Sequence, residues 1–476
     1  MMSLVNRSLG ALLALILLAG CSADAQPRLE SLAELKDEAP ARRHLDIQQW
    51  RTAEGAKVLF VEARELPMFD LRLTFAAGSS QDRGVKGLAV LTNAMLNEGI
   101  RGKDADAIAA GFESLGAQFG NGAYRDMAVA SLRSLSDPER RAPALELFAE
   151  VVGRPTFPND ALARIRNQLL AGIEFNKKNP SKLASQALFE QLYGGHPYAH
   201  PSEGTTQSLN GIRQAQLRDF HRRAYTASNA VISIVGDLSR SEAEAIAAEV
   251  SRALPRGPAL PKTVAPQAPT PGLKHIEYPS NQTHLQMAQL GISRGDPDYA
   301  ALYLGNQVLG GGGFGSRLME ELREKRGLTY GIYSGFSPMQ APGPFSISMQ
   351  TRADYSNGSL ALIKDQVRQF LAEGPTEAEL QQAKRELAGS FPLTTASNAA
   401  IAGQLTAIGF YDLPLDHLER FVDEVQGLSA DQVKAAMNRH LDPDAFVVVT
   451  VGPSVKQSEL PPPTGVGQPQ PSGVPH

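Results

Sequence analysis

The pattern of apolar and polar residues divides the chain into two stretches that resemble each other. "FDLRLTFAAGSS" and "THLQMAQLGISRGD" alternate apolar and polar residues, as a strand with one buried face does, and a helical pattern follows each. Further along, "AVISIV" and "FVVVTV" are β-branched runs that each follow a predicted helix and a polar turn. Such similarity between two parts of one chain indicates an internal duplication.

The order of these elements predicts the fold class. Strands and helices alternate irregularly, which favours an α+β sandwich in each half, with helices on one face of a sheet. The proline-rich segment "PRGPALPKTVAPQAPTPG", residues 255–272, predicts an extended spacer. We therefore expect two homologous half-domains, at residues 44–254 and 273–455, that face each other across a chamber.

The N-terminal end lies outside this pattern. Arg7 precedes the apolar run "LGALLALILLAG", which is too short to span a membrane and predicts a signal peptide at residues 1–20. The run leads into Cys21, and "LAGC" resembles a bacterial lipobox, whose cysteine is lipidated. Small residues in "SADAQ" leave ordinary signal cleavage as the alternative. We expect a lipid-anchored linker at residues 21–43 and a periplasm-facing lipoprotein, with Ser22 favouring the outer membrane.

Composition changes this picture little. A content of 42% hydrophobic and 20% charged residues is that of a globular protein. The net charge of -4 gives no electrostatic footprint for nucleic acid. Cys21 is the one cysteine, so the chain forms no internal disulfide. Residues 456–476 are rich in proline and poor in apolar residues, which predicts a disordered tail.

A glycine run at residues 310–313 precedes the charged segment "SRLMEELREKRG". Glycines before a helix can cradle phosphate. The pattern G-x-x-x-x-G-K-[ST] is absent, however, and G-x-G-x-x-G is met only loosely by Gly311, Gly313 and Ser316, so a nucleotide site is disfavoured.

The charged segment itself predicts a helix with Ser316 as N-cap and Gly327 just past its end. Leu318 and Leu322 fall on one face, and Glu321 and Lys325 can pair on another.

Arg323 lies in this helix, and Tyr330 follows it at the start of a predicted strand. The two side chains can converge on one point. A guanidinium group and a phenolic hydroxyl suit carbonyl or carboxylate oxygens. The alternative interpretation makes Arg323 a solvated charge on a helix surface.

The segment "SRLMEELREKRGLTYGIYS" resembles the C-terminal half-domain motif of the M16 zinc peptidases, the family of pitrilysin, insulinase and mitochondrial processing peptidase. The resemblance covers about residues 44–455 and includes "GGHPYAHPSEGTTQSLNGI", "YTASNAVISIVGD" and the linker. In that family an arginine and a tyrosine at this spacing bind the substrate backbone beside the scissile bond. The resemblance therefore implies this role for Arg323 and Tyr330.

The first half departs from the family pattern. Active members carry H-x-x-E-H on a helix, where two histidines bind zinc and the glutamate is the general base. The matching segment, "GLAVLTNAMLNEG", has Val90 and Ala94 at the ligand positions and Asn93 at the base position. The further glutamate ligand falls near residues 171–172. Glu174 is nearby, but one carboxylate without histidines makes no zinc site. The resemblance thus implies a chain without its own metal.

Other histidines do not replace the missing ligands. His196 and His200 in "HPYAH" are four residues apart, but the prolines after each disfavour a helix and hence a metal site there. His221 and His440 lie in the repeated helices, and we expect them at an interface or on the surface.

Some M16 peptidases divide the chemistry between two related chains, one of which has lost the zinc motif. The resemblance implies that this chain is such a non-catalytic subunit, with zinc, its ligands and the base in the partner. Gly311, Gly312 and Gly313 would then line the chamber wall, where a peptide backbone can approach. Two alternatives stay open: a peptide-binding or chaperone-like envelope lipoprotein without a peptidase, and a structural member of an envelope assembly.

Overall fold

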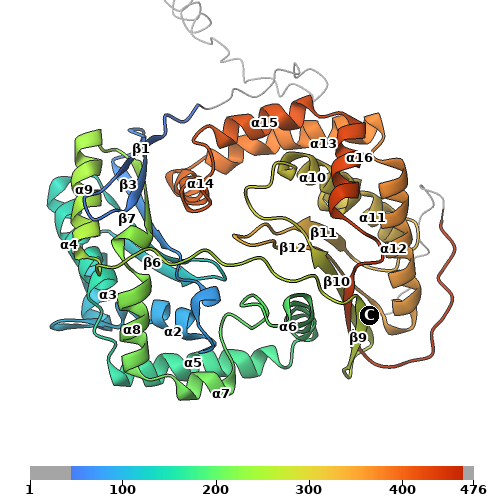
Figure 1. The fold of residues 1–476 in the computed structure, drawn as a ribbon, viewed down its shortest axis with the longest axis horizontal. Coiled ribbons are helices and arrows are strands. Elements are labelled where there is room, and N and C mark those ends of the chain that lie inside the picture. Colours follow the sequence, from blue (N-terminus) through green and yellow to red (C-terminus); the bar gives the residue numbers. More distant parts are fainter. Residues whose placement is uncertain (1–43, 465–476) are drawn as a thin grey trace, which may run out of the picture. The chain divides into compact units, whose positions relative to one another are not determined.

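The computed structural model describes residues 44–464 (Figure 1). The predicted signal peptide, Cys21 and the linker at residues 21–43 lie outside the described residues. No helix in the described part of the chain is long and apolar enough to cross a membrane.

The N-terminal half is built on a six-stranded sheet with the order β1-β2-β8-β3-β7-β6. β2 and β8 are parallel, and the other neighbours are antiparallel. The strands are β1 (Gln48–Arg51), β2 (Lys57–Glu62), β3 (Met68–Phe75), β6 (Gln118–Ala123), β7 (Ala128–Leu135) and β8 (Ala230–Gly236), with a small separate pair β4 (Gly99–Ile100) and β5 (Lys103–Asp104). The helices are α2 (Leu88–Ala94), α3 (Ala105–Ser114), α4 (Pro138–Gly153), α5 (Asn159–Asn176), α6 (Pro180–Tyr193), α7 (Thr206–Gly211), α8 (Gln214–Ala224) and α9 (Arg240–Ala253).

The C-terminal half repeats this arrangement in a five-stranded sheet with the order β11-β12-β10-β13-β9. β9 and β13 are parallel, as β2 and β8 are, and the other pairs are antiparallel. The strands are β9 (Gly272–Glu277), β10 (Gln282–Leu290), β11 (Ile332–Phe336), β12 (Pro344–Arg352) and β13 (Val447–Gly452). The helices are α10 (Tyr299–Asn306), α11 (Arg317–Met319), α12 (Ser356–Glu373), α13 (Glu377–Ser390), α14 (Asn398–Phe410), α15 (His417–Gly427) and α16 (Ala430–His440).

The duplication predicted from the sequence is confirmed by this topology. The runs "AVISIV" and "FVVVTV" form the equivalent strands β8 and β13, and the two alternating segments form β3 and β10. α8 and α16 precede β8 and β13, as the repeated pattern predicts.

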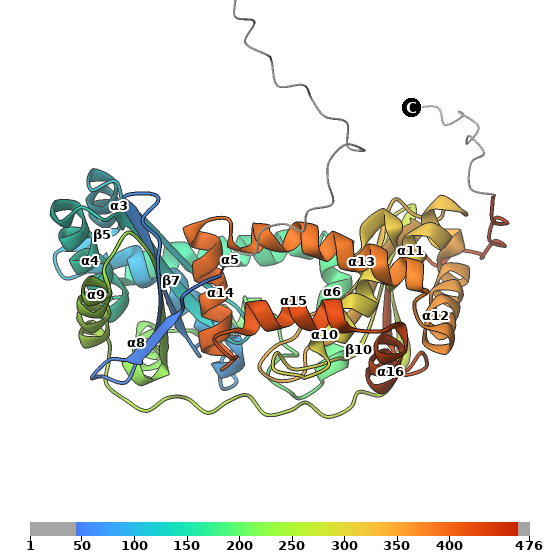
Figure 2. The ribbon, with the colours of Figure 1, turned by 90° about the horizontal axis from the view of Figure 1, so that it is seen from above.

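Each sheet is covered on both faces, whereas the sequence predicted helices on one face. In β8, Ile232 and Ile234 pack in the core of the N-terminal half, while Val231 and Val235 pack with residues of α14. Figure 2 shows α14, which belongs to the C-terminal half, beside the N-terminal sheet. Conversely, α6 packs on β13 and β10. Strands that are buried on both faces have continuous apolar runs, which explains why these two runs do not alternate.

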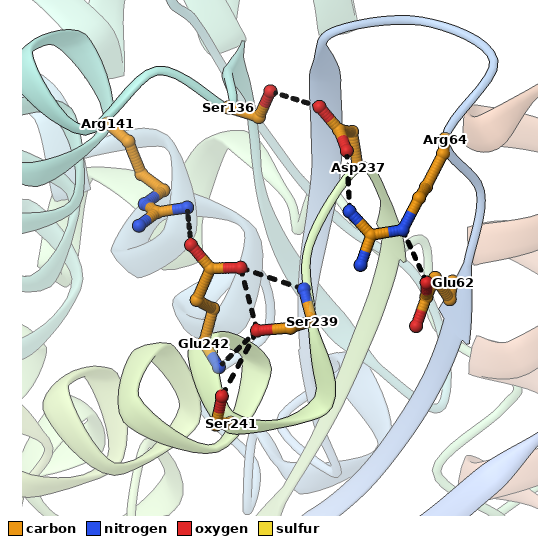
Figure 3. A network of polar contacts seen from close by, with 8 residues as sticks. All are labelled: Glu62, Arg64, Ser136, Arg141, Asp237, Ser239, Ser241 and Glu242. Carbon is orange, nitrogen blue, oxygen red and sulfur yellow. Dashed lines mark hydrogen bonds and ion pairs between the residues drawn. The ribbon is translucent and has the colours of Figure 1, made fainter.

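A polar network closes the turn between β8 and α9 (Figure 3). The Ser239 N–H and hydroxyl both donate to the Glu242 carboxylate at 2.8 Å, and Arg141 of α4 donates to it at 2.9 Å. These bonds, the backbone N–H first, lower the pKa of Glu242 to about 2. The Ser136 hydroxyl donates to Asp237 at 2.8 Å. These contacts therefore join the end of β7 to the end of β8, and α4 to the start of α9.

Two segments without regular structure lie on the folded halves. In the linker, Leu260 N–H donates to Asn229 and Thr263 N–H donates to Gln340 at 2.8 Å. Residues 456–464, which the sequence placed in a disordered tail, instead hydrogen-bond to the C-terminal half through Ser458 and Thr464. Leu460 packs against the core of the C-terminal half. The proline-rich composition of the tail did not indicate this apolar contact.

Candidate functional site

The helix α2 carries the positions that correspond to the zinc motif. Asp82 fixes its start, because its carboxylate accepts the N–H groups of Gly87 at 2.7 Å and Ala89 at 2.8 Å. Burial raises the pKa of Asp82 to about 7, although these two bonds favour the charged form. Gly87 has φ of 88°, and a Cβ there would lie 2.6 Å from the carbonyl oxygen of Glu203. The helix is therefore rigidly placed.

None of the three motif positions offers a metal ligand or a base. Val90 and Ala94 lie half-buried one turn apart, and neither has a donor atom. Asn93 is 2% exposed, and its Nδ2 donates to the Val129 carbonyl at 3.1 Å and to the Tyr225 hydroxyl at 3.2 Å. Val129 lies in β7 between β3 and β6, so the Asn93 amide ties α2 to the middle of the sheet. The position of the general base has thus become part of the core.

The position of the further ligand is equally without metal donors. Ala171 and Gly172 are exposed on α5, and Glu174 pairs with Lys177 at 2.6 Å. Within residues 44–464, the structure brings together one group of potential ligands, formed by Asp296, Asp298 and His440.

That group is an ion-pair cluster. Arg439 donates hydrogen bonds to both carboxylate oxygens of Asp298, at 2.9 and 2.6 Å, and His440 Nε2 lies 2.8 Å from the same carboxylate. The Arg439 hydrogen bond lowers the pKa of Asp298. The cluster fastens the end of α16 to the segment before α10.

The histidines in "HPYAH" lie in turns and not in a helix, as the prolines predicted. His196 bonds the carbonyl of Val264 in the linker at 2.8 Å, and His200 lies 3.8 Å from Asp82. In the described part of the chain they belong to no group of metal-ligating side chains.

The prediction of a surface or interface position for His221 is wrong. His221 is 6% exposed, bonds the Val152 carbonyl at 2.7 Å and stacks on Tyr225 at 5.0 Å. Burial lowers the pKa of His221 to about 4. The signal was present in the sequence, because His221 falls on the same helical face as Leu217 and Ala224, which are both buried.

In the C-terminal half, the predicted helix at residues 316–327 is formed by α11 and a π-helical turn, Glu320–Glu324, before Gly327 with φ of 63°. Leu318 and Leu322, which the sequence placed on one face, are both buried, and Lys325 lies 3.3 Å from Glu321, as the predicted pairing requires. Ser316 occupies the N-cap, but its hydroxyl donates to the Gly313 carbonyl at 2.7 Å and caps no helix N–H. π-helical turns are frequent at functional sites.

Arg323 lies in the π-helical turn, with its guanidinium carbon 4.3 Å from the centre of the Phe314 ring. Its Nη1 is 3.4 Å from the carboxylate of Glu324, yet it is buried and has no hydrogen-bond partner. Tyr330 is 90% exposed, just before β11. Both side chains belong to the described residues, and no hydrogen bond joins them, so their convergence on a substrate stays a prediction.

The glycine run has a packing reason of its own. A Cβ on Gly311 would lie 2.4 Å from Nδ2 of Asn306, and one on Gly312 would lie 2.6 Å from the Gln307 carbonyl oxygen. Gly313 has open space around it but a φ of 62°. A second π-helical turn, Gln307–Gly311, requires these close approaches. Contact of Gly311, Gly312 and Gly313 with a substrate stays a prediction.

Comparison with known proteins agrees with this geometry. The model of the insulinase family, peptidase family M16, matches residues 57–206, and the model of the peptidase M16 inactive domain matches residues 211–387. The crystal structure of a peptidase M16 inactive domain from Pseudomonas fluorescens is 65% identical and superposes with a TM-score of 0.86 over 88% of this chain and 100% of that chain.

Two curated relatives are more distant. The "non-peptidase homolog YmxG" of Helicobacter pylori is 27% identical over 412 residues, which are 85% of this chain and 93% of that protein. The "uncharacterized zinc protease YmxG" of Bacillus subtilis is 24% identical over 412 residues, which are 86% of this chain and 98% of that protein.

The chain belongs to peptidase family M16. Within that family it is of the inactive type, because Val90, Asn93 and Ala94 stand where the ligands and the base are needed.

Proposed function

We propose that this chain is the non-catalytic, substrate-binding subunit of a heterodimeric M16 zinc peptidase that acts on unfolded peptides in the cell envelope. The observation that carries the proposal is the contrast between the two halves. In α2 the motif positions have lost every metal donor, and Asn93 serves the core. In the other half, Arg323 and Tyr330 are both kept, although Tyr330 is 90% exposed and supports no packing.

Arg323 has the properties of a substrate-positioning residue. Its guanidinium group lies over the exposed Phe314 ring, and its buried Nη1 makes no hydrogen bond. Buried donors are nearly always hydrogen-bonded, and the ion pair with Glu324 at 3.4 Å does not supply such a bond, so Nη1 can still take an acceptor. We propose that a carbonyl oxygen of the bound peptide supplies that acceptor and that the Tyr330 hydroxyl donates to the same stretch of backbone.

The partner in this proposal is a homologous M16 chain with an intact H-x-x-E-H motif. It supplies zinc, the metal ligands and the general base, and this chain positions the peptide, which lowers the entropic part of the barrier. The predicted signal peptide and the lipobox-like sequence at Cys21 support an outer-membrane lipoprotein that faces the periplasm.

A reconstitution assay tests the proposal. Hydrolysis of a fluorogenic unfolded peptide is measured with this chain alone, with the zinc-bearing homologue from the same organism alone, and with the mixture. The mixture is expected to be far more active than either chain and to lose its activity with a chelator. Arg323→Ala in this chain should reduce the rate of the mixture, whereas Arg368→Ala, at an exposed ion pair on α12, should not.

Two results would refute the proposal. The first is chelator-sensitive hydrolysis by this chain alone. The second is a mixture no faster than the homologue alone. If the chain binds peptides but leaves the activity of the homologue unchanged, a peptide-binding or chaperone-like lipoprotein becomes the better interpretation. If the chain neither binds peptides nor changes that activity, a structural member of an envelope assembly becomes the better interpretation.

A further inference from the structure

A polar cavity of about 560 Å³ lies in the N-terminal half, apart from Arg323 and Tyr330. The end of α5, one face of α6 and the segment at residues 199–207 line it, together with Arg125 from the loop between β6 and β7. Ligand sites in proteins usually have volumes of about 300–1,000 Å³, so this cavity is large enough for a small ligand or one end of a peptide.

Arg125 is held in one orientation. Its Nε donates to the Tyr198 carbonyl at 3.2 Å, and its guanidinium carbon lies 3.8 Å from the centre of the Phe189 ring. The backbone is fixed as well, because the Arg125 carbonyl accepts from Ser80 N–H at 2.9 Å and approaches Gly78 so closely that a Cβ there would be 2.3 Å away. The cost of ordering this side chain is therefore met before any ligand binds.

The two terminal nitrogens of Arg125 remain available. Within residues 44–464, no carboxylate forms an ion pair with Arg125, and its one side-chain hydrogen bond uses Nε. Burial lowers the pKa of Arg125, as expected for a cation that lacks a direct counter-ion. A planar guanidinium group with two free N–H edges matches a carboxylate in a bidentate geometry.

The charges around the cavity favour a ligand with one negative charge. Lys182 of α6 also lines it and, among the described residues, has no ion-pair partner, while Lys177 is neutralised by Glu174 at 2.6 Å. Glu203 is the acidic residue of the lining. Asp126, next to Arg125 in the chain, also acts on it, but burial raises the pKa of Asp126 and so disfavours its charged form. Among the charged residues of the lining other than the paired Lys177, Arg125 and Lys182 exceed Glu203 by one positive charge, which a carboxylate balances.

The cavity adjoins the start of α2. The Ser79 hydroxyl donates to the Ser202 hydroxyl at 3.1 Å, and a Cβ on Gly204 would lie 2.6 Å from the Lys86 carbonyl oxygen. The wall of the cavity thus packs against the helix that carries the degenerate motif.

We propose that this cavity binds the carboxylate of a peptide, through Arg125 with Lys182 beside it. The carboxylate is either the free C-terminus or an acidic side chain. The inference rests on the proposed function in taking the ligand to be a peptide, but it concerns a different site.

Fluorescence anisotropy of labelled peptides with the full chain, without any partner, tests the inference. Three short peptides of otherwise neutral residues are compared: one with a free C-terminus, its C-terminal amide, and the amide with one internal glutamate. The free acid should bind roughly ten- to a hundredfold more tightly than the neutral amide, because a hydrogen bond to a charged group is lost in the amide. Binding of the glutamate peptide identifies a side-chain carboxylate as a second source, and its failure to bind restricts the site to C-termini.

Variants locate the binding. Arg125→Gln should lower the affinity for the free-acid peptide by a similar factor. Lys182→Gln, on the exposed surface of α6, should lower it by a few-fold. Arg222→Gln, an exposed arginine paired with Asp219, should have no effect. If Arg125→Gln does not fold, the Lys182 variant and the comparison of acid with amide decide the matter.

The inference is overturned if the amide binds as tightly as the free acid, if no peptide binds up to millimolar concentration, or if folded Arg125→Gln binds like the wild type. Inorganic phosphate that displaces the peptide at equal concentration would also overturn it, since the cavity would then be a general anion site. Arg125-dependent binding without stimulation of a zinc-bearing homologue would refute the proposed heterodimer and keep the cavity. Stimulation of the homologue without Arg125-dependent binding would refute the cavity as a carboxylate site and keep the proposed heterodimer.

Discussion

Replacing Asn93 by aspartate tests whether the former base position now belongs to the core. The two residues have nearly the same shape, but the carboxylate has lost the Nδ2 donor that serves the Val129 carbonyl and the Tyr225 hydroxyl. The site is 2% exposed, so a charged carboxylate there has almost no water. The variant should therefore take up a proton, and its protonated form can again donate to Val129.

The expected magnitude depends on pH. The loss of the two buried hydrogen bonds from Asn93 Nδ2 costs about 1–3 kcal/mol, and a buried charge adds to that cost. We expect Asn93→Asp to lose about 1 kcal/mol of stability at pH 5, where the side chain is protonated, and about 3 kcal/mol at pH 8. The sign follows from linkage: the folded pKa of the new carboxyl is raised, so the folded state holds more protons and its stability falls as the pH rises.

Urea unfolding followed by tryptophan fluorescence measures this difference. Trp50 is the one tryptophan of the chain and packs edge-on against Phe60 at 6.5 Å, so it reports on the N-terminal half. The titrations of Asp82 and His221 occur in wild type and variant alike and cancel in the difference. Asn167→Asp, at an exposed position of α5, is the matched control and should stay within about 0.5 kcal/mol of the wild type. A loss for Asn93→Asp that is as small as that of the control, or that is the same at both pH values, would refute the reasoning.

Three further predictions concern other parts of the chain. His221 has a folded pKa of about 4, below its unfolded value, so its titration should lower the free energy of unfolding by about 3 kcal/mol as the pH falls from 6.5 to 4. Urea unfolding at pH 6.5 and at pH 4 should show a smaller decrease for His221→Gln than for the wild type, and an equal decrease would contradict this assignment. Gly311→Ala should destabilise the C-terminal half by about 1–3 kcal/mol, because its Cβ would meet Asn306 at 2.4 Å; calorimetry measures this, and an unchanged transition would contradict the packing explanation. In the reconstituted heterodimer, Arg323→Ala should lower kcat/KM roughly 10- to 150-fold and Tyr330→Phe by less, with both melting curves unchanged; wild-type kinetics for both would refute the role of the pair in positioning the peptide and leave Arg323 with its contacts to Phe314 and Glu324 alone.

The strands and the duplication could be predicted because they follow local patterns. β3 and β10 show the alternation of a strand, and β8 and β13 are β-branched runs at equivalent places. The loss of the zinc site could also be read locally, since valine and alanine have no donor atoms in any fold.

The rest depends on contacts between residues far apart in the sequence. The continuous apolar runs of β8 and β13 reveal two buried faces but not that α14 and α6 from the opposite halves cover them. The cavity around Arg125 combines four separate segments, and no local pattern in any of them indicates that the four come together. The π-helical turn at Glu320–Glu324 depends on backbone hydrogen bonds that helix propensity does not distinguish from those of an α-helix.

The central claim is that this chain binds peptide without binding zinc. Elemental analysis of the purified chain after mild chelation tests it most directly, because zinc that is bound by a peptidase site survives such treatment while loosely bound metal does not. We predict far less than one zinc per molecule in this chain, since Val90, Asn93 and Ala94 provide no ligand, and zinc in the reconstituted heterodimer that the homologue accounts for. One tightly held zinc per molecule of the isolated chain would contradict the account.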